Sequence, residues 1–239
     1  MLRGMYSAAS AMDAAEKQQE VLAQNVAHSS TFGYRQQGIA FETFDRVLGR
    51  NNIPTGDLTG TTVSAAYTDF HQGALEHTTN MFDMAIDGDS FFVLNGPRGP
   101  LYTRNGSFHF DQQRQLVSEG GYPFRGATGP IQIPETAQKI EIASDGTVAA
   151  DRIFVGQLDR VRFNRVKDLE PAGITLFRAP PTSELEPSTA RVLQGYREAS
   201  NVSPSQAIVT MMLGMRYFEA SQRALNAIAE SIQLNTKPQ

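Results

Sequence analysis

Both ends of the chain carry apolar or uncharged residues at alternating steps of three and four. This spacing places them on one stripe of an α-helix, as in a coiled-coil heptad repeat. Near the N-terminus the stripe consists of Met5, Ala8, Met12, Ala15, Gln19, Leu22 and Val26. Near the C-terminus it consists of Ile208, Met211, Met215, Phe218, Gln222, Leu225, Ala229 and Ile232. Two long terminal helices are therefore predicted, and each stripe needs a partner.

Local signals set the bounds of these helices. The first is predicted from Leu2 to His28, with Gly33 as the place where the chain leaves helical geometry. The second is predicted from Pro204 to Asn235. Its start is marked by Ser203, which can cap the helix, and by proline at the first helical position. Gln206 completes a capping box with Ser203.

The middle of the chain changes to a period of two, which is typical of β-strands. The alternating pairs are Ile131 and Ile133, Ile140 and Ile142, and Val161 and Phe163. Dipeptides that end in glycine predict tight turns between such runs. These are Asn105-Gly106, expected to join Tyr102 and Phe108 in a hairpin, then Gly120-Gly121 and Asp145-Gly146. An antiparallel barrel or sandwich follows.

We therefore expect an α+β fold, in which long N- and C-terminal helices pair as a coiled-coil layer and a central domain is antiparallel all-β. Segments rich in glycine and proline, Gly49–Ala66 and Arg178–Ala190, are predicted connectors. The expected division is an N-terminal helix in 1–35, an extended connector in 36–68, the β domain in 69–180, and a connector with the C-terminal helix in 181–239.

Composition excludes several function classes. The chain has no cysteine, which removes disulfides, thiolate metal sites and cysteine nucleophiles. Its net charge is −4 and it has no long basic tract, so nucleic acid or an anionic membrane would attract it little. No apolar run approaches the roughly 20 residues that cross a bilayer. Asp13, Glu16, Lys17 and Glu20 interrupt any leader-like run, so we expect no cleaved signal peptide.

Patterns for catalysis, metals and cofactors are also missing from the sequence. The four histidines, His28, His71, His77 and His109, lack metal-ligand spacing. A hydrolase using Asp87 or Asp89 with His71 or His77 would still need a nucleophile, and no G-x-S-x-G elbow or phosphate-binding loop occurs. We therefore expect no catalytic residue, no cofactor and no metal.

Several strings of residues follow one another in an order that chance does not give. They are Asn25-Val26-Ala27, Thr31 to Arg35, Phe70 to Leu75, Asp83 to Val93, Tyr102 to Phe108, Asp145 to Val148, Gly156 to Leu158 and Gln194 to Val202. In this order they resemble the motifs of the bacterial flagellar rod and hook proteins, and they span nearly the whole chain. The motif residues carried by the resemblance are Asn25, Gly33, Tyr34, Gly73, Ala85, Ile86, Gly88, Phe91, Phe92, Tyr102, Thr103, Arg104, Gly106, Phe108, Gly195, Tyr196, Glu198, Ser200, Asn201 and Val202.

The resemblance implies a structural axial subunit of the flagellar basal-body rod. Such a subunit would assemble helically through its terminal helices, transmit torque and enclose the export channel. Its implied partners are copies of itself, other flagellar rod or hook proteins, and the flagellar export apparatus. The alternatives are a hook or hook–filament junction component, or a soluble hydrolase. The short stretch from Gly33 to Gly73 and the string Arg216–Glu219 favour the proximal rod type, although Gly195–Val202 fits both proximal and distal types.

Three residues depart from the family pattern. Ser90 stands where glycine is common, so a left-handed backbone at that position is in doubt. Arg197 replaces an aliphatic residue and His28 replaces asparagine.

Physical reasoning adds a hypothesis about assembly. One contact between two helices is insufficient to order both ends, so the ends are expected to be largely disordered in the exported monomer and to fold on joining neighbours. Gln19 and Gln222 would fix the register. The competing interpretation is a closed monomer whose two amphipathic helices pack on the β core.

Overall fold

The computed structural model describes residues 2–43 and 61–236, which form parts of two compact units. We call the first the terminal unit; it comprises residues 1–27, 36–69 and 202–239. The second, the β unit, comprises residues 28–35 and 70–201. The β unit thus extends beyond the range 69–180 expected from the sequence, because strands between residues 191 and 198 pair within it.

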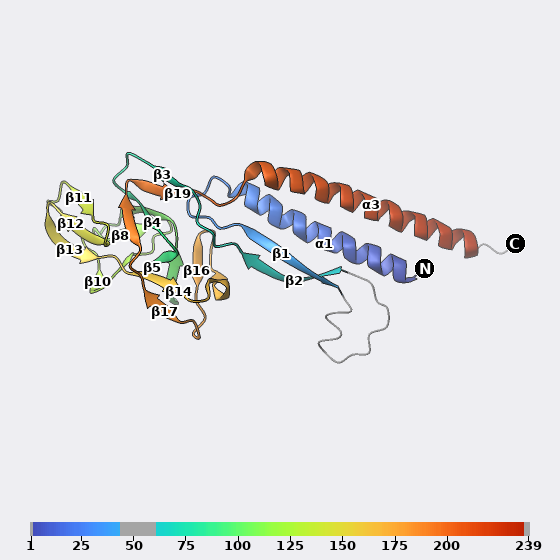
Figure 1. Cartoon of the computed structure of the whole chain (residues 1–239), viewed down its shortest axis with the longest axis horizontal. Helices are drawn as coiled ribbons and strands as arrows, with labels where there is room; N and C mark the ends of the chain where they lie inside the picture. The colour runs from blue at the N-terminus through green and yellow to red at the C-terminus, as the bar shows by residue number, and fades with distance from the viewer. Residues whose placement is uncertain (1, 44–60, 237–239) are drawn as a thin grey trace. The chain divides into compact units, whose positions relative to one another are not determined.

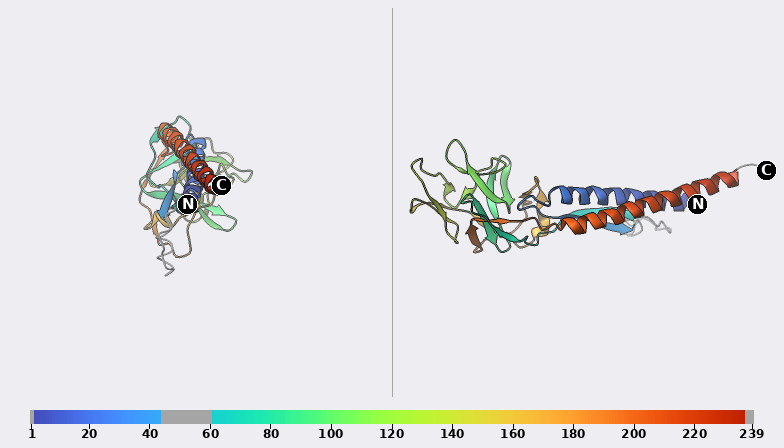
Figure 2. Two further views of the ribbon diagram at one scale, coloured as in Figure 1. Left: turned by 90° about the vertical axis from the view of Figure 1, so that its right-hand side faces the viewer. Right: turned by 90° about the horizontal axis from the view of Figure 1, so that it is seen from above.

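The terminal unit contains the two predicted long helices. Helix α1 spans Leu2–Ala27 and α3 spans Pro204–Thr236, each within one residue of its predicted bounds. The helices lie side by side (Figure 1), and the view from above agrees (Figure 2). The first turn of α3 closes where the sequence predicts, since the Ala207 N–H donates to the Ser203 carbonyl at 3.0 Å. The α+β class is confirmed.

A pair of antiparallel strands completes the terminal unit. Strand β1 (Gln37–Thr43) pairs with β2 (Thr61–Thr68), and both contact α1. The expected extended connector of residues 36–68 was therefore wrong for its described part, because its two ends pair with each other. Residues 49–60 of the expected connector Gly49–Ala66 lie outside the described residues.

The described part of the β unit is antiparallel throughout its paired strands. Its six-stranded sheet has the order β15-β16-β6-β5-β14-β17. These strands are β15 (Glu170–Pro171), β16 (Leu176–Arg178), β6 (Gly99–Thr103), β5 (Ser90–Gly96), β14 (Arg160–Phe163) and β17 (Leu185–Pro187). A four-stranded sheet has the order β18-β4-β7-β8. Its strands are β18 (Arg191–Gln194), β4 (Asp83–Asp87), β7 (Gly106–Phe110) and β8 (Leu116–Ser118).

Smaller sheets complete the β unit. A three-stranded sheet consists of β11 (Ile140–Ile142), β12 (Thr147–Ala150) and β13 (Ile153–Gln157), in that order. Two further pairs are β3 (Leu75–His77) with β19 (Tyr196–Glu198), and β9 (Arg125–Gly126) with β10 (Gly129–Pro130). One 3₁₀ turn, η1, covers Val166–Asp168. Part of the predicted connector Arg178–Ala190 is strand β17.

Strand β5 divides the interior of the β unit into two apolar clusters. Successive side chains of a strand point to opposite faces. Phe92 and Leu94 accordingly join the cluster that also holds Met84 and Phe108, whereas Phe91 joins a second cluster around Phe163. A strand buried on both faces needs a continuous apolar run, which explains why the two phenylalanines are adjacent.

The period-two prediction is confirmed. All six residues of the three alternating pairs are buried, with exposed fractions of 7% or less. The two basic residues of β14 differ in exposure. Arg162 is exposed, whereas Arg160 is buried and donates to the carbonyls of Ala190 and Asp145.

Two of the three predicted turns are confirmed. Gly121 (φ +77°) and Gly146 (φ +78°) both take the left-handed conformation that favours glycine. The predicted hairpin at Asn105-Gly106 was wrong, because β6 and β7 belong to different sheets. The chain turns a corner there, and Gly106 is required for a different reason. A Cβ at Gly106 would lie 1.9 Å from the carbonyl oxygen of Met84.

We expect Gly106→Ala to destabilise the β unit by about 1–3 kcal/mol, because the added methyl group must displace the backbone of β4. Gly173→Ala is the matched control, since its Cβ would only reach ordinary contact with Leu176, at 3.4 Å. Thermal unfolding followed by near-UV circular dichroism measures both variants. Equal melting temperatures for the two would contradict the corner geometry.

Candidate functional site

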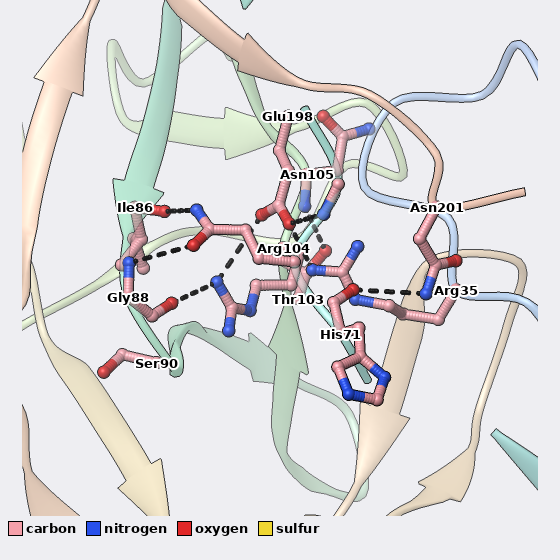
Figure 3. Close-up of polar contacts among 12 residues, drawn as sticks. Arg35, His71, Ile86, Gly88, Ser90, Thr103, Arg104, Asn105, Glu198 and Asn201 are labelled. Atoms are coloured by element: carbon pink, nitrogen blue, oxygen red, sulfur yellow. Dashed lines mark hydrogen bonds and ion pairs between the residues drawn. The ribbon is translucent and has the colours of Figure 1, made fainter. Parts of the chain in front are cut away.

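Residues from distant family-like strings meet around the carboxylate of Glu198 in the β unit. Glu198 lies on β19, and its side chain is fully buried. Its Oε1 accepts hydrogen bonds from Arg35 Nη2 and, at 3.0 Å, from the Gly73 N–H (Figure 3). Its Oε2 lies 3.5 Å from Arg104 Nη1. We call the set Arg35, Gly73, Arg104 and Glu198 the Glu198 cluster.

Arg104 connects this cluster to the end of β4. Its Nη1 donates to the Gly88 carbonyl at 2.6 Å, and its guanidinium lies 4.8 Å from the centre of the Phe91 ring. Burial lowers the pKa of Arg104 to about 10, while the Glu198 carboxylate acts in the opposite direction. Arg104 is therefore still charged at neutral pH. Two guanidinium groups share one carboxylate, and the Gly88 carbonyl and the Phe91 ring face help to stabilise the excess charge.

The side chain of Gln72 also binds the backbone at the end of β4. Its Nε2 donates to the Ile86 carbonyl at 2.8 Å, and its Oε1 accepts from the Gly88 N–H at 3.3 Å (Figure 3). One side-chain amide thus replaces a strand partner for the end of β4. The strings around Gly73, Gly88 and Arg104 therefore form a single hydrogen-bonded structure.

The corner after β6 has its own polar support. Thr103 Oγ1 donates to the Thr175 carbonyl at 2.8 Å and accepts from the Asn105 N–H at 3.0 Å. Asn105 Oδ1 accepts from the Ser107 N–H at 3.0 Å, and its Nδ2 donates to Glu119. These bonds satisfy backbone groups that a change of sheet would otherwise leave unpaired.

Close backbone approach explains the glycines beside the cluster. Gly33 has φ +72°, and its Cβ would lie 2.5 Å from the Asn105 backbone nitrogen. A Cβ at Gly73 would lie 1.9 Å from the Ala199 carbonyl oxygen. The Gly33 N–H also donates to the Glu198 carbonyl at 2.8 Å. The segment 28–35 is thereby fixed to β19, so the segments that precede β1 and α3 are held at one place in the β unit.

The other predicted motif residues lie elsewhere. Ala85, Ile86, Phe92 and Phe108 are core residues, and Phe91 and Tyr102 belong to the second cluster. Tyr34 packs 5.1 Å from the His28 ring, and Tyr196 packs 5.0 Å from the His77 ring. Gly195 has φ +75°, Ser200 is half-buried, and Asn201 donates to the His71 carbonyl.

Two motif residues belong to the terminal unit. Val202 is buried, and Asn25 exchanges two hydrogen bonds with the backbone of Gln37, at 2.7 and 2.9 Å. The Asn25 side chain thus fixes β1 against α1.

The sequence prediction of site residues omitted three important side chains. Arg35, Gln72 and Asn105 stand inside the quoted strings, but they were not singled out. Polar side chains of this kind usually lie on the surface. Their positions next to the motif residues Tyr34, Gly73 and Arg104 in the sequence could have identified them.

The three departures from the family pattern have local explanations. Ser90 is buried with its hydroxyl against that of Ser188, and the left-handed residue nearby is Gly88, at φ +125°. Arg197 Nε lies 2.8 Å from Asp83 Oδ2, and its guanidinium lies 4.7 Å from the centre of the Phe32 ring. The His28 ring contacts Tyr34, as noted above.

The predicted helix stripes are exposed to different extents. On α1, the six predicted stripe residues with described side chains are all half-buried, namely Ala8, Met12, Ala15, Gln19, Leu22 and Val26. Ala14 and Asn25 beside them are buried. On α3, Met211, Phe218, Leu225 and Ala229 are half-buried. Ile208, Met215 and Gln222 are exposed. The side chains of Met5 and Ile232 lie outside the described residues.

The buried stripe of α3 shares Met211, Phe218 and Leu225 with the predicted one, and its other members lie one position before predicted residues. It consists of Ala207, Met211, Gly214, Phe218, Ser221, Leu225 and Ile228, all buried or half-buried. The remaining apolar residues of these turns, which we call the outer stripe, spread over about half of the helix circumference. They are Ile208, Val209, Met212, Leu213, Met215 and Tyr217, and all six are exposed. Helix α3 therefore has two apolar faces over its first turns.

Within the described residues, no three histidine, aspartate or glutamate side chains gather as a metal ion would require. Neither of the two described helices is long and apolar enough to cross a membrane. The polar groups of the site instead hold backbone segments together.

Comparison with known families accounts for most of these motifs. Residues 5–35 match the flagella basal body rod protein family, residues 85–150 match the flagellar hook protein FlgE/F/G D1 domain, and residues 193–235 match the flagellar basal body rod FlgEFG protein C-terminal family. Flagellar basal-body rod protein FlgG of Buchnera aphidicola is 30% identical over 98% of this chain and 98% of its own length. The chain belongs to the flagellar rod and hook protein family.

Two further relatives agree. Flagellar basal-body rod protein FlgF of Mesorhizobium japonicum is 30% identical over 97% of this chain and 95% of its own length. Flagellar basal-body rod protein FlgG of Agrobacterium fabrum is 31% identical over 99% of both chains. The protein is thus a structural rod subunit of the flagellar basal body and not an enzyme, and the hook alternative is not favoured. It associates with other flagellar rod or hook components.

Replacing Glu198 by glutamine leaves two buried guanidinium groups without their carboxylate. We expect Glu198→Gln to destabilise the β unit by about 3–5 kcal/mol. Glu141→Gln is the control, because its partner Lys139 and Glu141 itself are largely exposed, and we expect an unchanged melting temperature. Calorimetry of both variants measures the difference. A Glu198→Gln protein as stable as the control would show that the cluster does not hold the β unit together.

Proposed function

We propose that this rod subunit extends the shaft by head-to-tail contacts of its terminal helices, encloses the export channel and transmits torque. We also propose that the flagellar export apparatus delivers it. The observation that carries the assembly proposal is the pair of apolar faces on α3. One face is occupied by α1 of the same chain, and the outer stripe is exposed.

The outer stripe has the composition of a contact surface. Ile208 and Met212 are 47% and 51% exposed, and neighbouring positions are also apolar. Further along, the same helix carries Glu219, Gln222 and Arg223, so the apolar region is confined to the first turns of α3. Burying each large side chain contributes on the order of 1 kcal/mol, so several must be covered together to fix a neighbour. Contiguous exposed apolar surface of this kind marks an interaction site.

A rod must continue rather than close. Its contacts therefore join different surfaces of successive copies, with a rotation that does not return to the start. One side of α3 is covered by α1 of the same chain, and the outer stripe is available to a neighbouring copy, which satisfies this requirement. Gln222 is exposed, so a register role for it belongs to contacts between copies, and the half-buried Gln19 is the corresponding candidate on α1.

We also infer that the chain is of the FlgF type. Its alignments with FlgG relatives run over 258 and 262 positions, more than its 239 residues, so these relatives carry residues that the chain lacks. The alignments with FlgF relatives run over 239 and 222 positions. The smaller number of gap positions in the FlgF alignments therefore favours FlgF.

We expect Met212→Glu to lower incorporation into basal bodies roughly tenfold or more, because a neighbour would have to bury the new charge. The helix content of the free protein should not change, since position 212 is exposed. Asn226→Glu is the matched control, lying on the same face two heptads further along. Immunoblots of isolated basal bodies and swimming in soft agar measure the effect. Equal incorporation of both variants would contradict the proposed role of the outer stripe.

The terminal helices should order fully only on assembly, because an amphipathic helix gains most of its stability from packing. Limited proteolysis of the free protein is therefore expected to remove both ends before it cuts the β unit. The same ends should resist the protease in isolated rods. Free protein with ends as resistant as the β unit would overturn this expectation.

A further inference from the structure

The first half of β13 is an exposed apolar edge. Ile153 and Phe154 are 70% and 66% exposed, more than any other large apolar side chain in the described part of the β unit. Strand β13 stands last in its sheet order, and Figure 1 shows it at the margin of the three-stranded sheet. At its far end the Gln157 carbonyl accepts from the Ala127 N–H, so the open edge is confined to the start of the strand. We call Ile153, Phe154 and this open edge the β13 patch.

The turn before the patch is rigidly held. Asp151 and Arg152 both have positive φ, of 49° and 69°, which is uncommon for residues other than glycine. The Asp151 carboxylate accepts hydrogen bonds from the N–H groups of Gln138 and Lys139, and the Asp151 N–H donates to the Lys139 carbonyl. The patch is therefore presented in one conformation and needs little ordering when it binds.

The register explains why the patch cannot turn inward. Ile153 pairs with Ala150 and Phe154 pairs with Ala149, after which a bulge shifts the register. Ala150 is already buried in the core, and β13 is the outermost strand, so Ile153 projects beyond the core while Phe154 lies on the opposite face. Both side chains are therefore left exposed at the margin of the sheet.

An exposed strand edge of this kind can pair with other chains and lead to aggregation. The strand sequence from Ile153 to Gln157 contains neither a charge nor a proline. Edge strands in free proteins are commonly protected by such residues against pairing with other chains. Their absence here is consistent with an edge that is covered in the working state of the protein.

The size of the patch indicates what covers it. An aromatic side chain buries at most about 150–250 Å², whereas a stable complex of two free proteins buries about 800 Å² on each partner. The patch is too small to hold a partner by itself. It suits a neighbour that other contacts already hold at high effective concentration, as within a polymer.

We propose that the β13 patch contacts the β unit of a neighbouring copy of this chain in the rod. The proposal rests on the proposed head-to-tail assembly. The contact joins the patch to a different surface of the neighbour, because pairing two identical edges would give a closed two-fold dimer.

Site-specific photo-crosslinking in assembled basal bodies tests this proposal. The probe is p-benzoylphenylalanine in place of Phe154, which retains an aromatic ring at this position. After irradiation we expect a product of twice the mass of the chain, whose peptides come from this chain alone and whose second crosslinked site lies between residues 70 and 201. The same probe at Thr128, an exposed residue of the β9–β10 turn, is the matched control and should give no such product.

A third variant, with the probe at Ile208 in the outer stripe, separates the two proposals. Crosslinking between copies from Ile208 but not from Phe154 would overturn the β13 contact and leave the assembly proposal standing. A product joining Phe154 to a different protein would also overturn it. A failure at both positions, in basal bodies that contain the chain, would contradict both proposals.

Discussion

The β unit depends on one buried carboxylate. Glu198 binds the side chains of Arg35 and Arg104 and the backbone of Gly73, and its own carbonyl accepts from Gly33. Together with Glu198 itself, these groups come from four separate stretches of the chain, around residues 33–35, 73, 104 and 198. A buried ion pair adds little net stability compared with apolar packing, but it imposes a single arrangement, because every alternative leaves a charge unpaired. For the proposed transmission of torque from one copy to the next, a single arrangement matters more than additional stability.

The terminal unit follows a different principle. Helix α1 covers one side of α3 and itself contacts the strands β1 and β2, while the outer stripe from Ile208 to Tyr217 stays open. If both faces of α3 were covered within one chain, no apolar face of this helix would be left to bind a neighbouring copy. Within the terminal unit, α1 packs on α3 and on the strand pair of β1 and β2. In the proposed rod, the exposed apolar face of the helix pair binds the next copy, and the β unit provides a rigid support.

Much of the fold could be predicted from the sequence, because strong periodicity and turn chemistry act locally. The bounds of α1 and α3 and the buried alternation of Ile140 and Ile142 are examples. The corner at Gly106 was missed because a glycine needed for close approach to Met84 looks like a hairpin glycine. The Glu198 cluster was missed because burial of Arg35 depends on contacts across 163 positions of sequence. The predicted stripe of α3 includes Ile208, Met215 and Gln222, which are exposed, because α3 is apolar on two sides and periodicity alone does not choose between them.

A cryo-electron density map of the intact basal body would test the central claim most directly. The account predicts that the side chains from Ile208 to Tyr217 are covered by helices of adjacent axial subunits, while the Glu198 cluster stays intact inside each copy. A map in which this face of α3 borders only solvent, with adjacent copies joined through other surfaces, would contradict it.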